Sequence, residues 1–184
     1  IKSDDKGYFK YNPSSDKLIS YPQLNYYEGH GYKQPMLEDS KGNIWLAGLG
    51  GEFTRIHTTT GYIDSFTINN MAAKPIPPKS TCTALYEDKQ GVCWIGTAEG
   101  FVEAIFNKGQ KSSPQIKWFY NNSSNRNSLN YNHVSCFLDD PNEPNKYLWI
   151  ATKGGGLNRL DKSTGDFFHL TTKDGLPDDV VYGI

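Results

Sequence analysis

The chain has 184 residues, the size of one ordinary domain, and 36% of them are hydrophobic. Its 19 basic and 20 acidic side chains give a formal net charge of -1, so no overall positive field is available to hold a nucleic acid. No apolar run approaches the roughly 20 residues of a membrane-spanning helix. We therefore expect a folded segment that contacts neither nucleic acid nor membrane.

The first stretch, residues 1–24, is interpreted as the end of a repeated unit. Residues 7–21 match the later half of a unit near the C-terminus, with Gly7 aligned to Gly156. In this register Ile1 directly follows the position of a tryptophan. We therefore expect the chain to begin inside a unit and to be a piece of a longer protein.

The connection that follows, residues 23–34, lacks the alternation of a strand. It contains three tyrosines and a histidine, namely Tyr26, Tyr27, His30 and Tyr32. Proteins hold neutral sugars with an aromatic face against the C–H surface of the ring and with polar donors to the hydroxyls. The composition predicts a ligand-binding loop, and the alternative is a solvated linker.

Three segments, 34–68, 81–120 and 134–172, align on a tryptophan that recurs about every 50 residues, within the range of four-stranded propeller blades. Each contains an apolar run, an acidic turn, a strand with the tryptophan, glycines, an alternating strand, a second turn and a last strand. Apolar residues on both faces of such a sheet predict that neighbouring sheets stack. The anchors are Trp45, Trp94 and Trp149.

Two kinds of side chain in these units are interpreted as structural. The tryptophans recur beside apolar neighbours, which favours packing between blades over stacking on sugars. The acidic residues Asp39, Asp88 and Asp140 precede turns, where carboxylates commonly accept hydrogen bonds from backbone amides.

The connections between units are the expected places for function, because loops on a rigid scaffold carry most binding sites. Residues 121–133 are rich in amides and add Arg126, Tyr131 and His133, which predicts a second ligand-binding loop with a solvated linker as the alternative. Residues 69–81 contain three prolines, which favours an extended packing or partner surface.

The last stretch, residues 178–184, matches the opening strand of another unit. The predicted fold class is therefore all-β, a β-propeller fragment of four-stranded antiparallel blades with three complete blades and two partial ones. Unpaired sheet edges at both ends favour self-association.

One run carries a family resemblance. Leu-Trp-Ile-Ala-Thr-Lys-Gly-Gly-Gly-Leu-Asn-Arg, from Leu148, is followed by Gly-Leu-Pro at 175–177 and resembles the two-component-regulator propeller repeat. The resemblance implies a periplasmic sensor segment of a hybrid two-component protein that detects oligosaccharides and signals through a downstream histidine kinase. The parent would be anchored in the inner membrane.

Two other functions stay open, a propeller-type glycosidase or lyase and a non-catalytic interaction scaffold. No catalytic residue can be assigned, because adjacent acids such as Asp139 and Asp140 point to opposite faces of a strand. The four histidines lack the short spacing of metal ligands. We expect no metal, no cofactor and no enzymatic activity in this segment.

Overall fold

The computed structural model describes residues 2–3, 7–21, 35–47, 51–68, 81–106 and 114–184. The chain divides into two units, Ile1–Lys33 and Gln34–Ile184. The first unit holds a three-stranded antiparallel sheet, in the order β1 (Lys2–Ser3), β2 (Gly7–Asn12) and β3 (Lys17–Tyr21). Among the described residues, no helix is long and apolar enough to cross a membrane.

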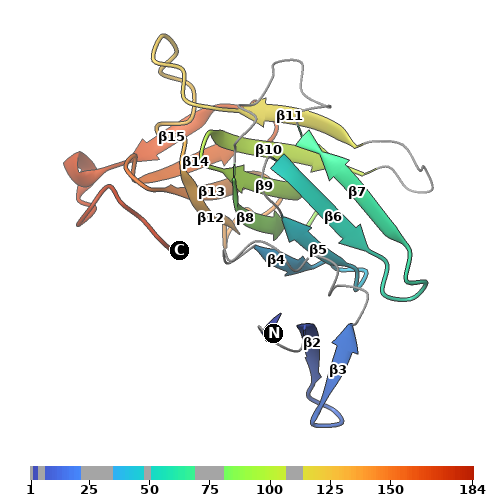
Figure 1. Ribbon diagram of the computed structural model, residues 1–184. Helices are drawn as coiled ribbons and strands as arrows, with labels where there is room; N and C mark the ends of the chain where they lie inside the picture. The colour runs from blue at the N-terminus through green and yellow to red at the C-terminus, as the bar shows by residue number, and fades with distance from the viewer. Residues whose placement is uncertain (1, 4–6, 22–34, 48–50, 69–80, 107–113) are drawn as a thin grey trace. The chain divides into compact units, whose positions relative to one another are not determined.

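The second unit contains three four-stranded antiparallel sheets, in each of which the strands follow one another in sequence order (Figure 1). The first sheet consists of β4 (Met36–Glu38), β5 (Ile44–Ala47), β6 (Glu52–Ile56) and β7 (Ile63–Thr67). The second consists of β8 (Cys82–Glu87), β9 (Cys93–Thr97), β10 (Gly100–Ile105) and β11 (Gln115–Phe119). The third consists of β12 (Val134–Asp139), β13 (Tyr147–Thr152), β14 (Leu157–Asp161) and β15 (Phe167–Leu170).

The first strands of neighbouring sheets lie against one another. Strand β8 contacts β4 on one side and β12 on the other. Separate sheets that stack through their first strands are the arrangement of propeller blades, and the predicted fold class is confirmed.

In each of these three blades the carboxylate of the acidic turn residue accepts the same set of hydrogen bonds. One carboxylate oxygen accepts backbone amides of the turn, as Asp39 Oδ1 does from Lys41 at 3.0 Å and Asn43 at 2.8 Å. The other oxygen accepts the indole N–H of the blade's tryptophan. These Nε1–Oδ2 distances are 2.9 Å for Trp45–Asp39, 3.0 Å for Trp94–Asp88 and 2.9 Å for Trp149–Asp140. The structural role predicted for these acids is confirmed.

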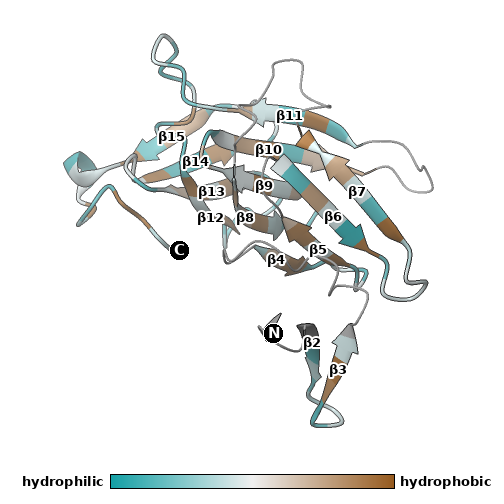
Figure 2. Ribbon diagram, in the orientation of Figure 1, coloured by the Kyte–Doolittle hydropathy of each residue, from teal (hydrophilic) through white to brown (hydrophobic). Residues whose placement is uncertain are grey.

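The hydrophobic core lies between the blades, and Figure 2 shows apolar stretches along β5 and β8. Trp45 is buried among residues of the first and second blades, including Cys82, Cys93 and Ile95. Trp94 is buried among residues of the second and third blades. The predicted inter-blade packing is confirmed for both tryptophans, whereas Trp149 lies half-buried on the third blade.

Glycine is required where the third strand of a blade begins. Gly100 and Gly156 have φ angles of 129° and 70°, in the region that L side chains rarely adopt. A Cβ atom at either position would collide with the carbonyl oxygen of the fourth strand, at Phe119 and Leu170 respectively. The recurring glycines therefore allow the two strands to approach.

The chain after β15 is held against the third blade. It forms the short 3-10 helix η4 (Thr172–Asp174) and then crosses the β13–β14 turn. The backbone N–H groups of Gly154 and Gly156 donate to the carbonyl of Asp179, at 3.0 and 2.8 Å. Residues 178–184 contribute one antiparallel bridge, from Val180 to Lys153, rather than a strand.

Candidate functional site

The connection between β11 and β12 is anchored to the third blade. Leu129 is fully buried in the core between the second and third blades. The neighbouring Asn130 donates its backbone N–H to Asn158 Oδ1 and its side-chain amide to the carbonyl of Gly155, both at 2.9 Å. Leu129 and Asn130 therefore fix the end of this connection to the third blade, whereas residues 121–127 are exposed.

Asparagines fold this connection onto itself. The backbone N–H of Asn121 donates to Asn132 Oδ1 at 2.6 Å, and Asn121 Nδ2 donates to the carbonyl of Leu129 at 2.8 Å. Asn127 Oδ1 accepts the backbone N–H of Phe167 at 2.6 Å. A loop that is ordered before it meets a ligand loses less conformational entropy on binding.

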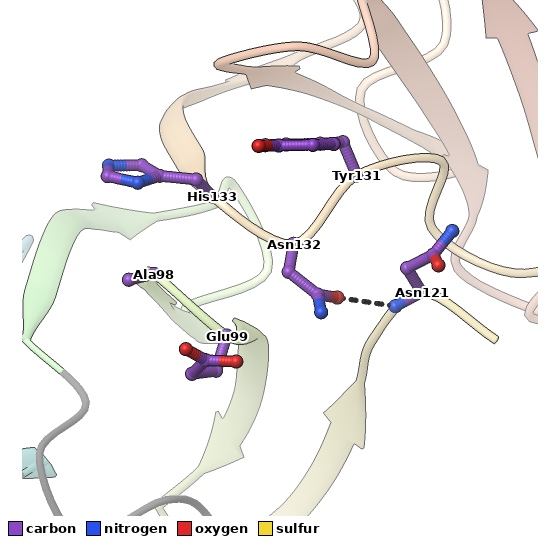
Figure 3. A pocket seen from close by; sticks show the side chains of 6 residues that line it. All are labelled: Ala98, Glu99, Asn121, Tyr131, Asn132 and His133. Carbon is purple, nitrogen blue, oxygen red and sulfur yellow. Dashed lines mark hydrogen bonds between the residues drawn. The ribbon is translucent and has the colours of Figure 1, made fainter.

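A pocket of about 430 Å³ lies between this connection and the β9–β10 turn (Figure 3). Its volume is within the range of small-molecule sites. The turn contributes Ala98 and Glu99, and the connection contributes the other lining residues, which are Asn121, Tyr131, Asn132 and His133.

Tyr131 forms one wall of the pocket, supported by glycine backbone. A Cβ atom at Gly154 would lie 3.1 Å from the ring, and one at Gly155 would lie 2.6 Å from Tyr131 Cβ. The Tyr131 ring therefore packs against backbone at positions 154 and 155, where a side chain on either residue would obstruct it. The residue remains 45% exposed, so part of its aromatic surface is available for a ligand.

His133 lies at the edge of the pocket and is half-buried. Burial lowers the pKa of its imidazole, the charge of Lys153 lowers it further, and the charge of Glu99 partly opposes both. Its Nε2 atom is buried and has no hydrogen-bond partner among the described residues. The neutral form of the imidazole is therefore favoured relative to that of an exposed histidine.

Glu99 supplies the pocket's carboxylate. Its backbone N–H donates to Thr97 Oγ1 at 3.0 Å, as the backbone N–H of Gly155 donates to Thr152 Oγ1 at 3.1 Å in the third blade. Glu99 thus occupies the turn position that is glycine one blade later. Its carboxylate has no hydrogen bond or ion pair within the part of the chain that the structure describes.

The structure brings two of the predicted ligand residues together and separates a third. Tyr131 and His133 line the pocket. Arg126 does not, since its side chain is exposed and its carbonyl accepts a hydrogen bond from His169 Nε2 at 3.3 Å. The predictions for the first loop, at Tyr26, Tyr27, His30 and Tyr32, fall outside the described residues.

Two lining residues, Glu99 and Asn132, were not predicted from the sequence. Asn132 lies in the predicted loop but has no signal beyond its amide. Glu99 could have been found by aligning the turns of the blades, because a charged side chain replaces glycine there. Among the described residues, no three His, Cys, Asp or Glu side chains are grouped as metal ligands would be.

Comparison with known protein families bears on the blade that contributes Glu99. Residues 76–99 match the family model of the two component regulator propeller. The match covers one stretch of the chain, up to the β9–β10 turn. No curated protein matches the chain significantly.

Solved structures with the same fold include two bacterial surface proteins. The extracellular domain of a protein assigned to a hybrid two-component system of B. thetaiotaomicron has a TM-score of 0.66 and 19% identity, covering 84% of this chain and 20% of that chain. PorZ, a component of the type-IX secretion system of Porphyromonas gingivalis, has a TM-score of 0.66 and 20% identity, covering 97% of this chain and 26% of its own. The chain thus spans 20% and 26% of these two proteins, and at these identities the likeness shows the fold alone.

An enzyme has the same fold as well. Virginiamycin B lyase from Staphylococcus aureus has a TM-score of 0.56 and 19% identity, covering 88% of this chain and 48% of that chain. Propellers carry unrelated functions, so the role of this repeat has to be argued from its own site.

Proposed function

We propose that the chain is an extracytoplasmic sensor segment of a hybrid two-component signalling protein and that it detects oligosaccharides. The match of residues 76–99 to the two component regulator propeller supports the signalling role. The likeness to an extracellular domain of such a system supports a periplasmic location. The parent protein would be anchored in the inner membrane and would carry the histidine kinase.

The pocket beside Tyr131 is the observation that carries the ligand assignment. Its exposed ring offers a surface for the C–H face of a sugar, which is the usual aromatic contact of carbohydrate sites. Asn132 presents an amide N–H₂ group, and Glu99 presents a carboxylate that accepts hydrogen bonds from hydroxyls. The anchored connection holds Tyr131 and Asn132 in place before the ligand arrives, and the β9–β10 turn holds Glu99.

The position of the pocket suggests how binding would be transmitted. The β9–β10 turn belongs to the second blade, whereas the connection is fixed to the third blade through Asn158 and Gly155. A ligand that touches both elements favours one arrangement of the two blades over others. Such a shift between populated arrangements would pass along the propeller to the kinase.

Calorimetric titration of the protein with a panel of glycan fragments tests the proposal. Tyr131→Ala should weaken binding about five- to tenfold, because aromatic contacts contribute about 1 kcal/mol beyond burial. Tyr62→Ala is the matched control, since this tyrosine is 51% exposed and lies outside the pocket.

Three results would contradict the proposal. Absence of heat with every fragment would favour the interaction scaffold. New reducing ends or unsaturated products would favour a glycosidase or lyase. Equal affinities of Tyr131→Ala and the unmodified protein would place the ligand elsewhere.

A further inference from the structure

The pocket offers more hydrogen-bond acceptors than donors. The side-chain N–H₂ of Asn121 already donates to the carbonyls of Leu129 and Asn130, at 2.8 and 3.1 Å. Asn132 Oδ1 already accepts the backbone N–H of Asn121. Among the described residues, the groups left for a ligand include the Asn132 amide N–H₂, the Tyr131 hydroxyl, Asn121 Oδ1 and both oxygens of the Glu99 carboxylate.

The charge of the pocket is negative. Glu99 is the one acidic side chain among its lining residues, which include no lysine or arginine, and burial and the charge of Lys153 lower the pKa of His133 and so disfavour its protonated form. The ammonium group of Lys153 lies 5.8 Å from the centre of the Tyr182 ring. Within the described ranges, Lys153 forms no ion pair with Glu99.

A ligand that covers Glu99 removes water from a carboxylate that has no hydrogen-bond or ion-pair partner among the described residues. Desolvation of a charge is unfavourable unless the ligand brings a compensating charge or hydrogen-bond donors. A uronate or sulfate group brings neither and is repelled. An ammonium group brings three donors and the opposite charge, and it is also attracted to an aromatic face such as that of Tyr131.

We propose that the pocket selects an oligosaccharide with a free amino group, a hexosamine, and that Glu99 is the residue that determines this specificity. The inference rests on the proposed function, because it names the sugar class that the same pocket takes. Tyr131 supports the sugar ring, and Glu99 accepts the hydrogen bonds of the ammonium group.

Three tetrasaccharides with the same β-1,4 linkage and ring configuration test this specificity. They carry a hydroxyl, a free amine or an N-acetyl group at carbon 2, and they are cellotetraose, the glucosamine tetramer and the N-acetylglucosamine tetramer. Calorimetry at about pH 6 favours the protonated amine, since this pH lies below the range of about 7.7–8.0 in which the α-amino groups of peptides titrate. The glucosamine tetramer should bind about tenfold more tightly than cellotetraose, as expected for a hydrogen bond between charged groups.

Glu99→Gln isolates the charge, since it keeps the shape of the side chain. It should abolish the preference for the amine, so that the glucosamine tetramer and cellotetraose bind the variant with affinities within about twofold of each other. Glu143→Gln is the matched control, because it removes one negative charge from an exposed side chain outside the pocket. Circular dichroism spectra of both variants should match that of the unmodified protein.

The outcomes separate the two proposals. Equal binding of the three tetrasaccharides, or a preference that survives in Glu99→Gln, overturns the amine inference and leaves an oligosaccharide sensor. Tighter binding of a galacturonate tetramer than of the glucosamine tetramer overturns it as well. Absence of binding to any glycan contradicts the proposed function itself.

Discussion

The two interfaces between blades of the second unit are closed by different chemistry at one equivalent position. Glu103 lies opposite Trp94 where β10 pairs with β9, and Arg159 lies opposite Trp149 where β14 pairs with β13. Phe106 in the second blade and Lys162 in the third each lie three residues after these positions. In the first interface the Phe106 ring lies 4.8 Å from the Trp45 ring, centre to centre. In the second, Lys162 replaces the aromatic ring with an ammonium group.

The first interface is aromatic and cationic. The guanidinium of Arg55 lies over the rings of Trp45 and Phe106, at 5.2 and 5.0 Å from their centres. Asp64 holds this guanidinium from the neighbouring strand, at 2.6 Å. The arginine therefore covers an apolar interface, and its charge is balanced within the blade.

The second interface is ionic. Lys162 Nζ lies 2.9 Å from Asp88 Oδ2 in the second blade and 2.9 Å from Asp139 Oδ1 in the third. All three side chains are almost completely buried. A buried ion pair contributes little net stability compared with an apolar contact, but loss of one member leaves an uncompensated charge. The comparison shows that one blade geometry accommodates both solutions, with different sensitivities to mutation.

Both interfaces share one backbone contact. The N–H after the acidic turn residue donates to the acid that ends the next blade's first strand, as Ser40 does to Glu87 and Lys89 does to Asp139. Pro141 occupies the same place in the third blade and has no N–H to donate. This shared hydrogen bond joins neighbouring blades in both interfaces, so the residue at the equivalent position can be an aromatic one, as Phe106 is, or a charged one, as Lys162 is.

Lys162→Met should give the largest effect. The variant keeps an apolar stem but leaves Asp88 and Asp139 buried without a cation, so the free energy of unfolding should fall by about 3–5 kcal/mol. Urea unfolding followed by tryptophan fluorescence measures it. Lys173→Met, at an exposed position in η4, is the control and should change little. A loss below about 1 kcal/mol would show that the ionic contact is dispensable.

Phe106→Ala should give a smaller loss in the first interface. The ring is half-buried, so the loss should be about 2 kcal/mol, below the range for fully buried phenylalanines. The same unfolding assay applies. If Phe106→Ala costs more than Lys162→Met, the ranking of the two interfaces is wrong.

The stability of the protein at alkaline pH distinguishes the second interface from the first, because only the second contains the buried Lys162. Burial alone would lower the pKa of Lys162, but hydrogen bonds and charges of Asp88 and Asp139 raise it above the usual value. Its contribution is therefore complete below about pH 10.4 and is lost as the pH rises through the raised pKa. Unfolding midpoints measured between about pH 9 and 12 should fall more steeply for the unmodified protein than for Lys162→Met, with the difference appearing above about pH 10. Parallel curves would contradict this assignment.

The stability of the protein at acidic pH tests the first interface, and the expected change in the free energy of unfolding is smaller than that for Lys162. Burial opposes ionisation of Asp64, but hydrogen bonds from His57 and Arg55 outweigh it and lower the pKa of the carboxyl group. Its contribution is complete above about pH 4 and is lost as the pH falls through the lowered pKa. Asp64→Asn should reduce stability at pH 7 by about 1 kcal/mol and flatten the acid side of the profile. An unchanged acid profile in this variant would exclude Asp64 as a contributor.

The repeated sequence made the blades predictable because each blade is built from local contacts. Alternating apolar residues and the acidic turn residue with its tryptophan lie within a few residues of one another and recur about every 50 residues. Asp39 and Trp45 illustrate this, since they are close in sequence and hydrogen-bonded in the structure. Aromatic and amide composition also pointed to Tyr131 and His133 in the pocket.

Contacts between blades were not predictable, because they join residues far apart in sequence. Lys162 gives no sign of its partner Asp88, which lies on another blade. Arg126 was predicted to contact a ligand because it lies in an amide-rich loop. In the structure, hydrogen bonds of Asn127 and of the Arg126 carbonyl fix this stretch of backbone to β15, and Arg126 does not line the pocket. Glu99 was missed because its role depends on the connection that packs opposite its turn.

The rates at which the cysteines are modified show whether the two interfaces open separately. The expected differences in these rates are the smallest of the predicted effects. Cys82 and Cys93 are buried in the first interface, where burial raises the pKa of Cys82 to about 12 and raises that of Cys93 as well. Cys136 is half-buried in β12. In native protein, an aromatic disulfide reagent should therefore modify Cys136 first, because the other two thiols react only through local opening.

Phe106→Ala should accelerate modification of Cys82 and Cys93, since it loosens the interface that covers them. Lys162→Met should accelerate it less in native conditions, although it lowers global stability more, if the first interface opens without the second. Mass spectrometry of tryptic peptides assigns each modified thiol, and Cys136→Ser removes the fast background. Equal acceleration by the two variants would mean that the blades open as one cooperative unit, and the chemical difference between the interfaces would then affect global stability alone.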